Sequence, residues 1–135
     1  MTTNRKCRVA RRWTSRSSTK VPAGGGSAEY WAWPTSSTEA SLLVIRWTAT
    51  GAVKWARCYA GAARLQDRAE DEAVDAKGNV YVCGSTRSAR GTDWIVIKYS
   101  SAGSRLWTWK YAGPFRGDDA PVEMLLDARG QAFVT

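Results

Sequence analysis

The sequence predicts an all-β protein made of repeated four-stranded antiparallel sheets. The first observation is an internal repeat, in which residues 44–83 return as residues 96–135 at a fixed offset of 52 positions without a gap. The second is that short β-branched and aromatic runs end at glycine turns, with no convincing helical period in residues 41–135. The third is that each period holds four such runs, the number of strands in a β-propeller blade.

The repeat is carried by identical residues at equivalent positions of the two copies. These pairs are Val44/Val96, Ile45/Ile97, Gly51/Gly103, Trp55/Trp107, Tyr59/Tyr111, Asp67/Asp119, Asp75/Asp127, Gly78/Gly130 and Val82/Val134. A residue that recurs in each copy is more readily explained as part of the architecture than as a unique functional group. The repeat is therefore evidence about the fold rather than about function.

Residues 1–40 are expected to be a separate basic segment, either disordered or foreign to the repeat family. They hold seven of the 20 Lys and Arg residues of a chain with net charge +8, and residues 24–27 form a Gly/Ser linker. A basic segment can bind nucleic acid, here through residues 5–20. Because it lacks a sustained helical period and regularly spaced aromatics, we interpret it as a solvated arm, and nucleic-acid binding stays an alternative.

Strands are expected throughout residues 41–135. In chain order they are 42–48, 53–60, 72–75, 80–85, 93–100, 105–112, 122–127 and 132–135. Short turns join them as antiparallel hairpins, with glycine at positions 51, 78, 103 and 130. Residues 94–99 are largely apolar on both alternating faces, so the sheet that contains them must be covered on both sides.

The phase of these strands predicts about two blades of a propeller. Two outer strands come first, one complete blade spans residues 72–112, and two inner strands follow. Since closed propellers have four or more blades, we expect a fragment of a larger propeller or one completed by oligomerisation. Open strand edges at both ends would favour self-association.

The residue types argue against several kinds of chemistry. Histidine is absent, which excludes a histidine-based catalytic triad, and no zinc-type spacing exists. We expect no catalytic residue, cofactor or metal. The recurring Asp75/Asp127 and Asp67/Asp119 pairs are expected to accept backbone hydrogen bonds in turns and crossovers. The acidic run 70–72 is expected to be a solvated rim.

The unpaired pattern of the three cysteines predicts no disulfide framework. Cys58 aligns with Lys110 and Cys83 with Thr135, so a bridge would not recur in the repeat. Both are expected to be small buried side chains. The recurring aromatics, Trp55/Trp107 and Tyr59/Tyr111, are expected to anchor packing between blades. Trp94 and Trp109 do not recur as tryptophan, and they too are expected in the core.

Residues 75–86 (DAKGNVYVCGST), 93–99 (DWIVIKY) and Gly103 with Trp107 resemble the bacterial SBBP-type β-propeller repeat. That family shows D-x-x-G-N-x-Y-V-x-G-x-T, then D-x-x-x-x-K-Y, then G-x-x-x-W. The resemblance covers residues 42–135, although the second copy has Gln131 and Phe133 in place of Asn and Tyr. It implies a non-enzymatic scaffold or binding module within a large bacterial protein that is extracellular or attached to the cell surface.

A second resemblance is to the propeller of quinoprotein (PQQ) dehydrogenases. Residues 50–55 (TGAVKW) fit the T-G-x-x-x-W end of their docking motif, but the upstream Ala and Asp of that motif are replaced by Ile45 and Trp47. A glycine turn followed by a packing tryptophan explains the half-match equally well. A quinoprotein fragment is therefore kept as the alternative function.

Propellers bind ligands through loops at the ends of their central channel. Here these would be the loops around 64–71, 86–92 and 114–120. The candidate surface contacts are Arg64, Asp67, Arg87, Arg90, Arg116, Asp118 and Asp119. The expected ligand is an unidentified protein or glycan. No run of about 18 apolar residues exists, so no membrane span is predicted.

Overall fold

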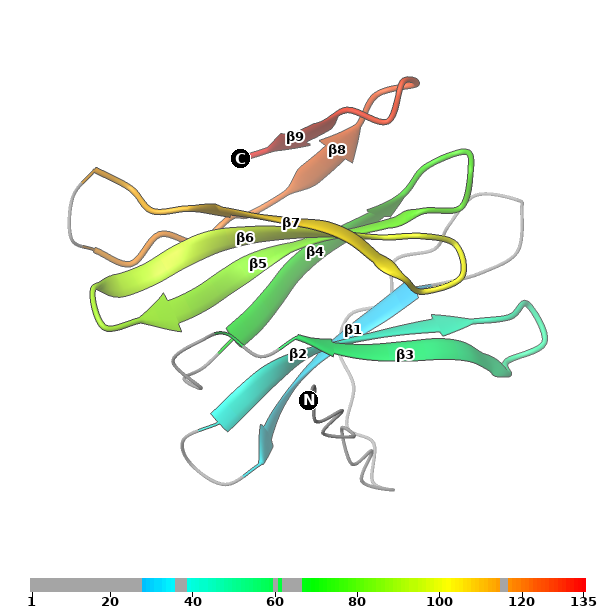
Figure 1. Ribbon diagram of the computed structural model, residues 1–135, viewed down its shortest axis with the longest axis horizontal. Coiled ribbons are helices and arrows are strands. Elements are labelled where there is room, and N and C mark those ends of the chain that lie inside the picture. Colours follow the sequence, from blue (N-terminus) through cyan, green and yellow to red (C-terminus); the bar gives the residue numbers. More distant parts are fainter. Residues whose placement is uncertain (1–27, 36–38, 60, 62–66, 115–116) are drawn as a thin grey trace.

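A computed structural model describes residues 28–35, 39–59, 61, 67–114 and 117–135. Over these residues the protein is all-β, with nine strands in three antiparallel sheets and no helix (Figure 1). The all-β class and the antiparallel hairpins predicted from the sequence are confirmed, while the propeller arrangement stays a prediction. Within the same residues no helix is long and apolar enough to cross a membrane.

The central sheet, sheet B, is a four-stranded meander in the order β4-β5-β6-β7. Its strands are β4 (Asp67–Val74), β5 (Val80–Ser88), β6 (Gly91–Tyr99) and β7 (Arg105–Tyr111). The expected loops at 64–71 and 86–92 are therefore wrong in part. Strand β4 begins at Asp67, and β5 continues to Ser88 and joins β6 through a tight hairpin. The ends of β4 and β5 are polar, so the sequence alone does not indicate strands there. In the structure these residues pair across the two strands, beginning with Asp67 opposite Thr86.

Sheet A has three strands in the order β1-β2-β3, namely β1 (Ala28–Thr35), β2 (Glu39–Trp47) and β3 (Val53–Tyr59). Strand β1 lies inside the segment that the sequence separates from the repeat. In the pairing of β1 with β2, Ala28 lies opposite Arg46. One repeat later, in the pairing of β5 with β6, Tyr81 lies opposite Lys98. After subtraction of the 52-residue period, the two registers differ by one residue. A shift of one residue exchanges the two faces of a strand. Strand β1 is thus no true copy of β5.

The 52-residue repeat is reproduced in three dimensions. The β2–β3 and β6–β7 hairpins have the same register and a bulge at the same place, and their turn glycines have nearly equal left-handed φ angles, 84° for Gly51 and 86° for Gly103. Glycine is required there because other residues adopt this conformation at a cost. Sheet C, formed by β8 (Met124–Leu126) and β9 (Ala132–Val134), repeats the register of β4 and β5 beyond their bulge.

The central strands of sheet B, β5 and β6, are packed on both faces, as the sequence predicted for residues 94–99. Ile95, Ile97 and Tyr99 join residues of sheet A in one core cluster, whereas Val96 joins Met124 of sheet C in a second cluster on the other face. Figure 1 shows sheet B between the other two sheets. The alternation of a β-strand, with successive side chains on opposite faces, produces this arrangement.

The two described cysteines differ in state. Cys83 is free and fully buried, and this burial raises the pKa of its thiol to about 12. The expectation of a small buried side chain is confirmed there. Cys58 is half-buried and disulfide-bonded, so the same expectation is wrong for Cys58.

The connections divide the molecule into two ends (Figure 1). The turn end carries the tight glycine turns at 48–52, 75–79, 100–104 and 127–131. The loop end carries the β5–β6 hairpin and the segment between β7 and β8. Since β5 runs from one end to the other, a residue at 76–79 and a residue at 87–90 lie at opposite ends of the same strand.

Candidate functional site

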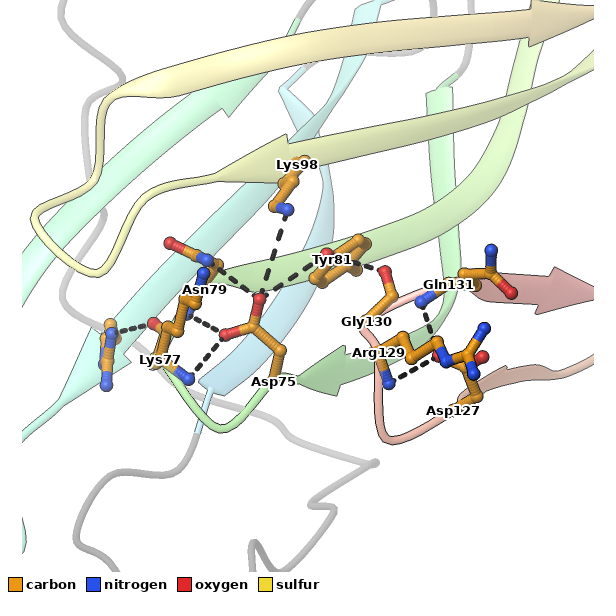
Figure 2. A network of polar contacts seen from close by, with 11 residues as sticks. Asp75, Lys77, Asn79, Tyr81, Lys98, Asp127, Arg129, Gly130 and Gln131 are labelled. Atoms are coloured by element: carbon orange, nitrogen blue, oxygen red, sulfur yellow. Dashed lines mark hydrogen bonds and ion pairs between the residues drawn. The ribbon is translucent and has the colours of Figure 1, made fainter.

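Asp75 organises the turn between β4 and β5. Its Oδ1 accepts hydrogen bonds from the backbone N–H groups of Lys77 (3.0 Å) and Asn79 (2.9 Å), and its Oδ2 accepts one from the Asn79 amide (2.8 Å) (Figure 2). The Lys98 ammonium lies 4.0 Å from the same Oδ2. The carboxylate therefore closes the turn from within, as short acceptor side chains do.

Asp127 repeats this arrangement in the next copy. Its Oδ1 accepts from the backbone N–H groups of Arg129 and Gln131, each at 2.8 Å (Figure 2). The Tyr81 hydroxyl donates to the Gly130 carbonyl at 3.0 Å and so connects sheet B to this turn. The structural role predicted for the two recurring aspartates at the turn end is confirmed.

Stability should depend on the ionisation of Asp75. Burial raises the pKa of this carboxyl, but hydrogen bonds from Asn79 and Lys77 and the charge of Lys98 outweigh it, so the pKa is lowered from 3.8. A lowered folded pKa contributes stability that is present above 3.8 and is lost as pH falls through the folded value. Asp75→Asn is expected to cost about 1 kcal/mol at pH 7, and this deficit should shrink below about pH 4. Urea unfolding of both proteins at pH 7, 5 and 3 measures it; an undiminished deficit at pH 3 would contradict the role.

The turn at 100–103 accepts hydrogen bonds from side chains of sheet A. The indole N–H of Trp55 and one guanidinium N–H of Arg46 donate to the Ser101 carbonyl at 3.1 and 3.2 Å. The guanidinium of Arg57 donates to the Gly103 carbonyl at 2.6 Å. Sequence reasoning missed the two arginines; the one available signal was that Arg46 returns as Lys98. These contacts fasten strands β2 and β3 of sheet A to the turn end of sheet B.

Asp67 is buried at the loop end, with 1% of its surface exposed. Its Oδ2 accepts from the Gly61 N–H and its Oδ1 from the Thr86 hydroxyl, both at 2.6 Å. Asp67 thus lies in the interior rather than on the surface, because the carboxylate ties the crossover from sheet A into sheet B. Asp119 accepts the equivalent bond from the Gly113 N–H at 3.1 Å. The crossover role predicted for both residues is confirmed.

Thr92 fastens the two connections at the loop end to each other. Its backbone N–H donates to the Gly117 carbonyl at 3.3 Å, and its carbonyl accepts from the Asp119 N–H at 3.0 Å. Its hydroxyl lies 2.8 Å from Oδ1 of Asp118. A short parallel bridge between Thr92 and Asp118 results. The segment after β7 is therefore held against the β5–β6 hairpin.

The structure brings the described part of the predicted binding set to one end. Arg87 and Arg90 are exposed on the β5–β6 hairpin, and Asp118 is exposed beside Thr92. Asp119 is half-buried by its bond to Gly113. Arg64 and Arg116, like the basic residues 5–20, lie outside the described residues.

The acidic run at 70–72 is a strand rather than a solvated rim. It lies in β4, where Glu72 is buried and Asp71 accepts from the Met124 backbone N–H at 2.7 Å. Asp71 sits at the bulge of β4, where the local change of twist turns its side chain toward sheet C. The expectation for this run is therefore wrong, because it took no account of the bulge.

The recurring aromatics differ between the copies. Trp55 and Tyr59 are buried, as expected of packing anchors, whereas Trp107 and Tyr111 are exposed at 41% and 43%. Trp109 is 49% exposed and stacks on Tyr111, so its expected place in the core is wrong. We call Trp107, Trp109 and Tyr111 the aromatic row of β7. Alternate residues of a strand share one face, so the row forms a single surface.

The aspartate hydrogen bonds described above are suited to stabilising the fold, and the exposed residues of the loop end are suited to contacting a partner. The recurring carboxylates are engaged with backbone groups, and the described residues hold no group of three or more His, Cys, Asp or Glu suited to a metal ion. No family model matches the chain, and no curated protein matches it.

Proposed function

We propose that the protein is a non-enzymatic scaffold of propeller-type repeats that binds a partner at its loop end. Three features support the scaffold role: the recurrence of the same turns, the same aspartate ties and the same strand registers in successive copies. In this proposal the three sheets are successive blades, with sheet B complete. The resemblance to SBBP-type repeats favours a bacterial surface or extracellular location.

The bridge between Thr92 and Asp118 carries the binding proposal. It holds two connections in one place, so the exposed guanidinium groups of Arg87 and Arg90 stand on a braced hairpin rather than on a free loop. The Ser88 hydroxyl, which is within 3.1 Å of the Gly91 carbonyl and 3.2 Å of the Arg90 N–H, braces the hairpin further. Two preorganised guanidiniums favour a ligand with carboxylate or sulfate groups.

The test compares two double variants of the full chain with the same change in charge. Arg87→Ala/Arg90→Ala removes the guanidiniums of the loop end, whereas Lys77→Ala/Arg129→Ala removes two exposed charges of the turn end. Heparin and polygalacturonate oligosaccharides are the probes, and calorimetry at fixed salt measures the dissociation constant. The loop-end variant should bind about tenfold more weakly or worse, since each charge-assisted hydrogen bond contributes about 1.5–3 kcal/mol. The turn-end variant should bind like the original protein.

Equal losses in both variants would show attraction by net charge alone and would overturn a site at the loop end. The basic segment 1–27 is present in both variants and so cannot produce a difference between them. A lack of binding to either oligosaccharide by the unaltered protein would overturn the anionic-glycan form of the proposal.

A further inference from the structure

The aromatic row of β7 occupies the place that a covered surface occupies one repeat earlier. Trp107 is equivalent to Trp55, and Tyr111 is equivalent to Tyr59. The earlier pair is 6% and 8% exposed, and the later pair is 41% and 43% exposed. The same residues in the same strand register thus differ in what lies against them.

What covers Trp55 is the glycine turn at 100–103. A Cβ on Gly103 would lie 2.8 Å from the Trp55 ring, so the ring rests directly on the glycine backbone. The Trp55 indole N–H donates to the Ser101 carbonyl, and Arg57 donates to the Gly103 carbonyl. The glycine turn at 100–103 is therefore the surface on which Trp55 packs, and we call such a turn the seat of the tryptophan.

The chain carries the same seat a second time, at residues 48–51. The Gly51 N–H donates to the Thr48 carbonyl at 2.9 Å, as the Gly103 N–H donates to Ser100. Gly51 has nearly the same left-handed φ as Gly103, yet among the described residues no atom lies within 4 Å of where its Cβ would be. One chain thus presents both an uncovered tryptophan face and an uncovered seat of the kind that covers its equivalent.

We propose that a second copy of this chain docks its 48–51 turn on the aromatic row of β7. Trp107 then rests on Gly51 of the second copy and its indole N–H meets the Ala49 carbonyl, the equivalent of Ser101. Trp109 stands at the position of Arg57 and offers an N–H donor of its own. The incoming β2–β3 hairpin lies beside sheet C, where β9, three residues long, is the element that must shift to admit β1.

The contact is head to tail, because the aromatic row of one copy meets the turn of the next. Such an interface leaves one row and one turn free in every dimer, so it propagates into a ring or a chain of copies. The burial of two tryptophans at its centre is typical of residues that dominate an interface. The proposal goes beyond ligand binding at the loop end and does not depend on it.

Analytical ultracentrifugation of the full chain over a range of concentrations tests the assembly. Trp107→Ala and Gly51→Asn should each raise the dissociation constant by about thirtyfold or more, the effect of removing a central anchor. Asparagine tolerates a left-handed turn, and in the single copy no atom of the described part of the chain lies within 4 Å of the position its Cβ would take. Leu106→Ala is the matched control: Leu106 is 53% exposed on the same strand, and its equivalent, Lys54, stays exposed beside the covered Trp55.

Mixing the two impaired variants gives the sharpest result. Trp107→Ala retains an intact 48–51 turn, and Gly51→Asn retains an intact aromatic row. An equimolar mixture should therefore form a one-to-one dimer and no larger assembly. A monomeric unaltered protein at 100 µM (about the scale of weak association), unchanged association of either variant, or no dimer in the mixture would overturn the proposal. Heparin binding in these variants and association of Arg87→Ala/Arg90→Ala report separately on the function at the loop end.

Discussion

Trp55→Ala is expected to lower the free energy of unfolding by about 3–5 kcal/mol, whereas Trp107→Ala should lower it by about 1 kcal/mol. The two residues are identical and occupy equivalent positions of the repeat. Trp55 is 6% exposed, packs against Tyr99 at a centroid distance of 5.7 Å and rests on Gly103. Its truncation leaves a cavity between two sheets and removes one of the two hydrogen bonds that the Ser101 carbonyl accepts, the other coming from Arg46. Trp107 loses mainly an edge contact with Tyr81.

Urea unfolding followed by far-ultraviolet circular dichroism measures both variants. The measurement belongs at low protein concentration, where association through the aromatic row contributes least. A loss for Trp107→Ala equal to that for Trp55→Ala would show that the exposed face is covered within a single copy. A loss below about 1 kcal/mol for Trp55→Ala would show that the interface between sheets A and B contributes little to stability.

Asp67→Ala is expected to lower the free energy of unfolding by about 2–4 kcal/mol. The substitution leaves the buried Gly61 N–H and Thr86 hydroxyl without their hydrogen-bond acceptor, and each unsatisfied buried group costs about 1–3 kcal/mol. There is little free space at this site, since a Cβ on Gly61 would lie 2.5 Å from the Thr86 hydroxyl oxygen.

The repeat supplies a matched control for this residue. Asp119→Ala removes a single bond of 3.1 Å from a half-buried position and should cost about 1 kcal/mol. Asp67→Asn should recover much of the loss, because its oxygen accepts from Gly61 while its NH₂ donates to the Thr86 hydroxyl. Thermal unfolding of the three variants measures the series. An Asp67→Asn protein as unstable as Asp67→Ala would show that charge, rather than hydrogen bonding, holds the crossover.

Strands rich in β-branched and aromatic residues were predictable from the sequence. Residues 94–99 show this best, since Ile95, Ile97 and Tyr99 face sheet A and Val96 faces sheet C. The start of β4 and the β5–β6 hairpin were not predictable in the same way. Asp67, Glu70 and Arg87 are polar, and local preference places such residues in loops, but pairing with a neighbouring strand overrides that weak preference.

The candidate site was predictable only in part. The recurrence of Asp67 and Asp75 correctly indicated backbone acceptors, because a group needed in each copy serves each copy. Position in a loop wrongly suggested that Asp67 was also available on the surface. Arg46 and Arg57 were missed because their partners are carbonyl groups 32 to 55 residues away, and backbone groups leave no signature in a sequence.

By itself the sequence determined the all-β class, the 52-residue unit and the glycine turns that recur with it, since alternation and left-handed turns are local properties of the chain. Only the tertiary structure decided which member of each equivalent pair is covered. Trp55 and Trp107 are the same residue in the same strand context, yet one lies under a neighbouring turn and the other faces outward. Burial depends on which sheet packs alongside, and the residues that recur in the repeat do not indicate which neighbour each copy has.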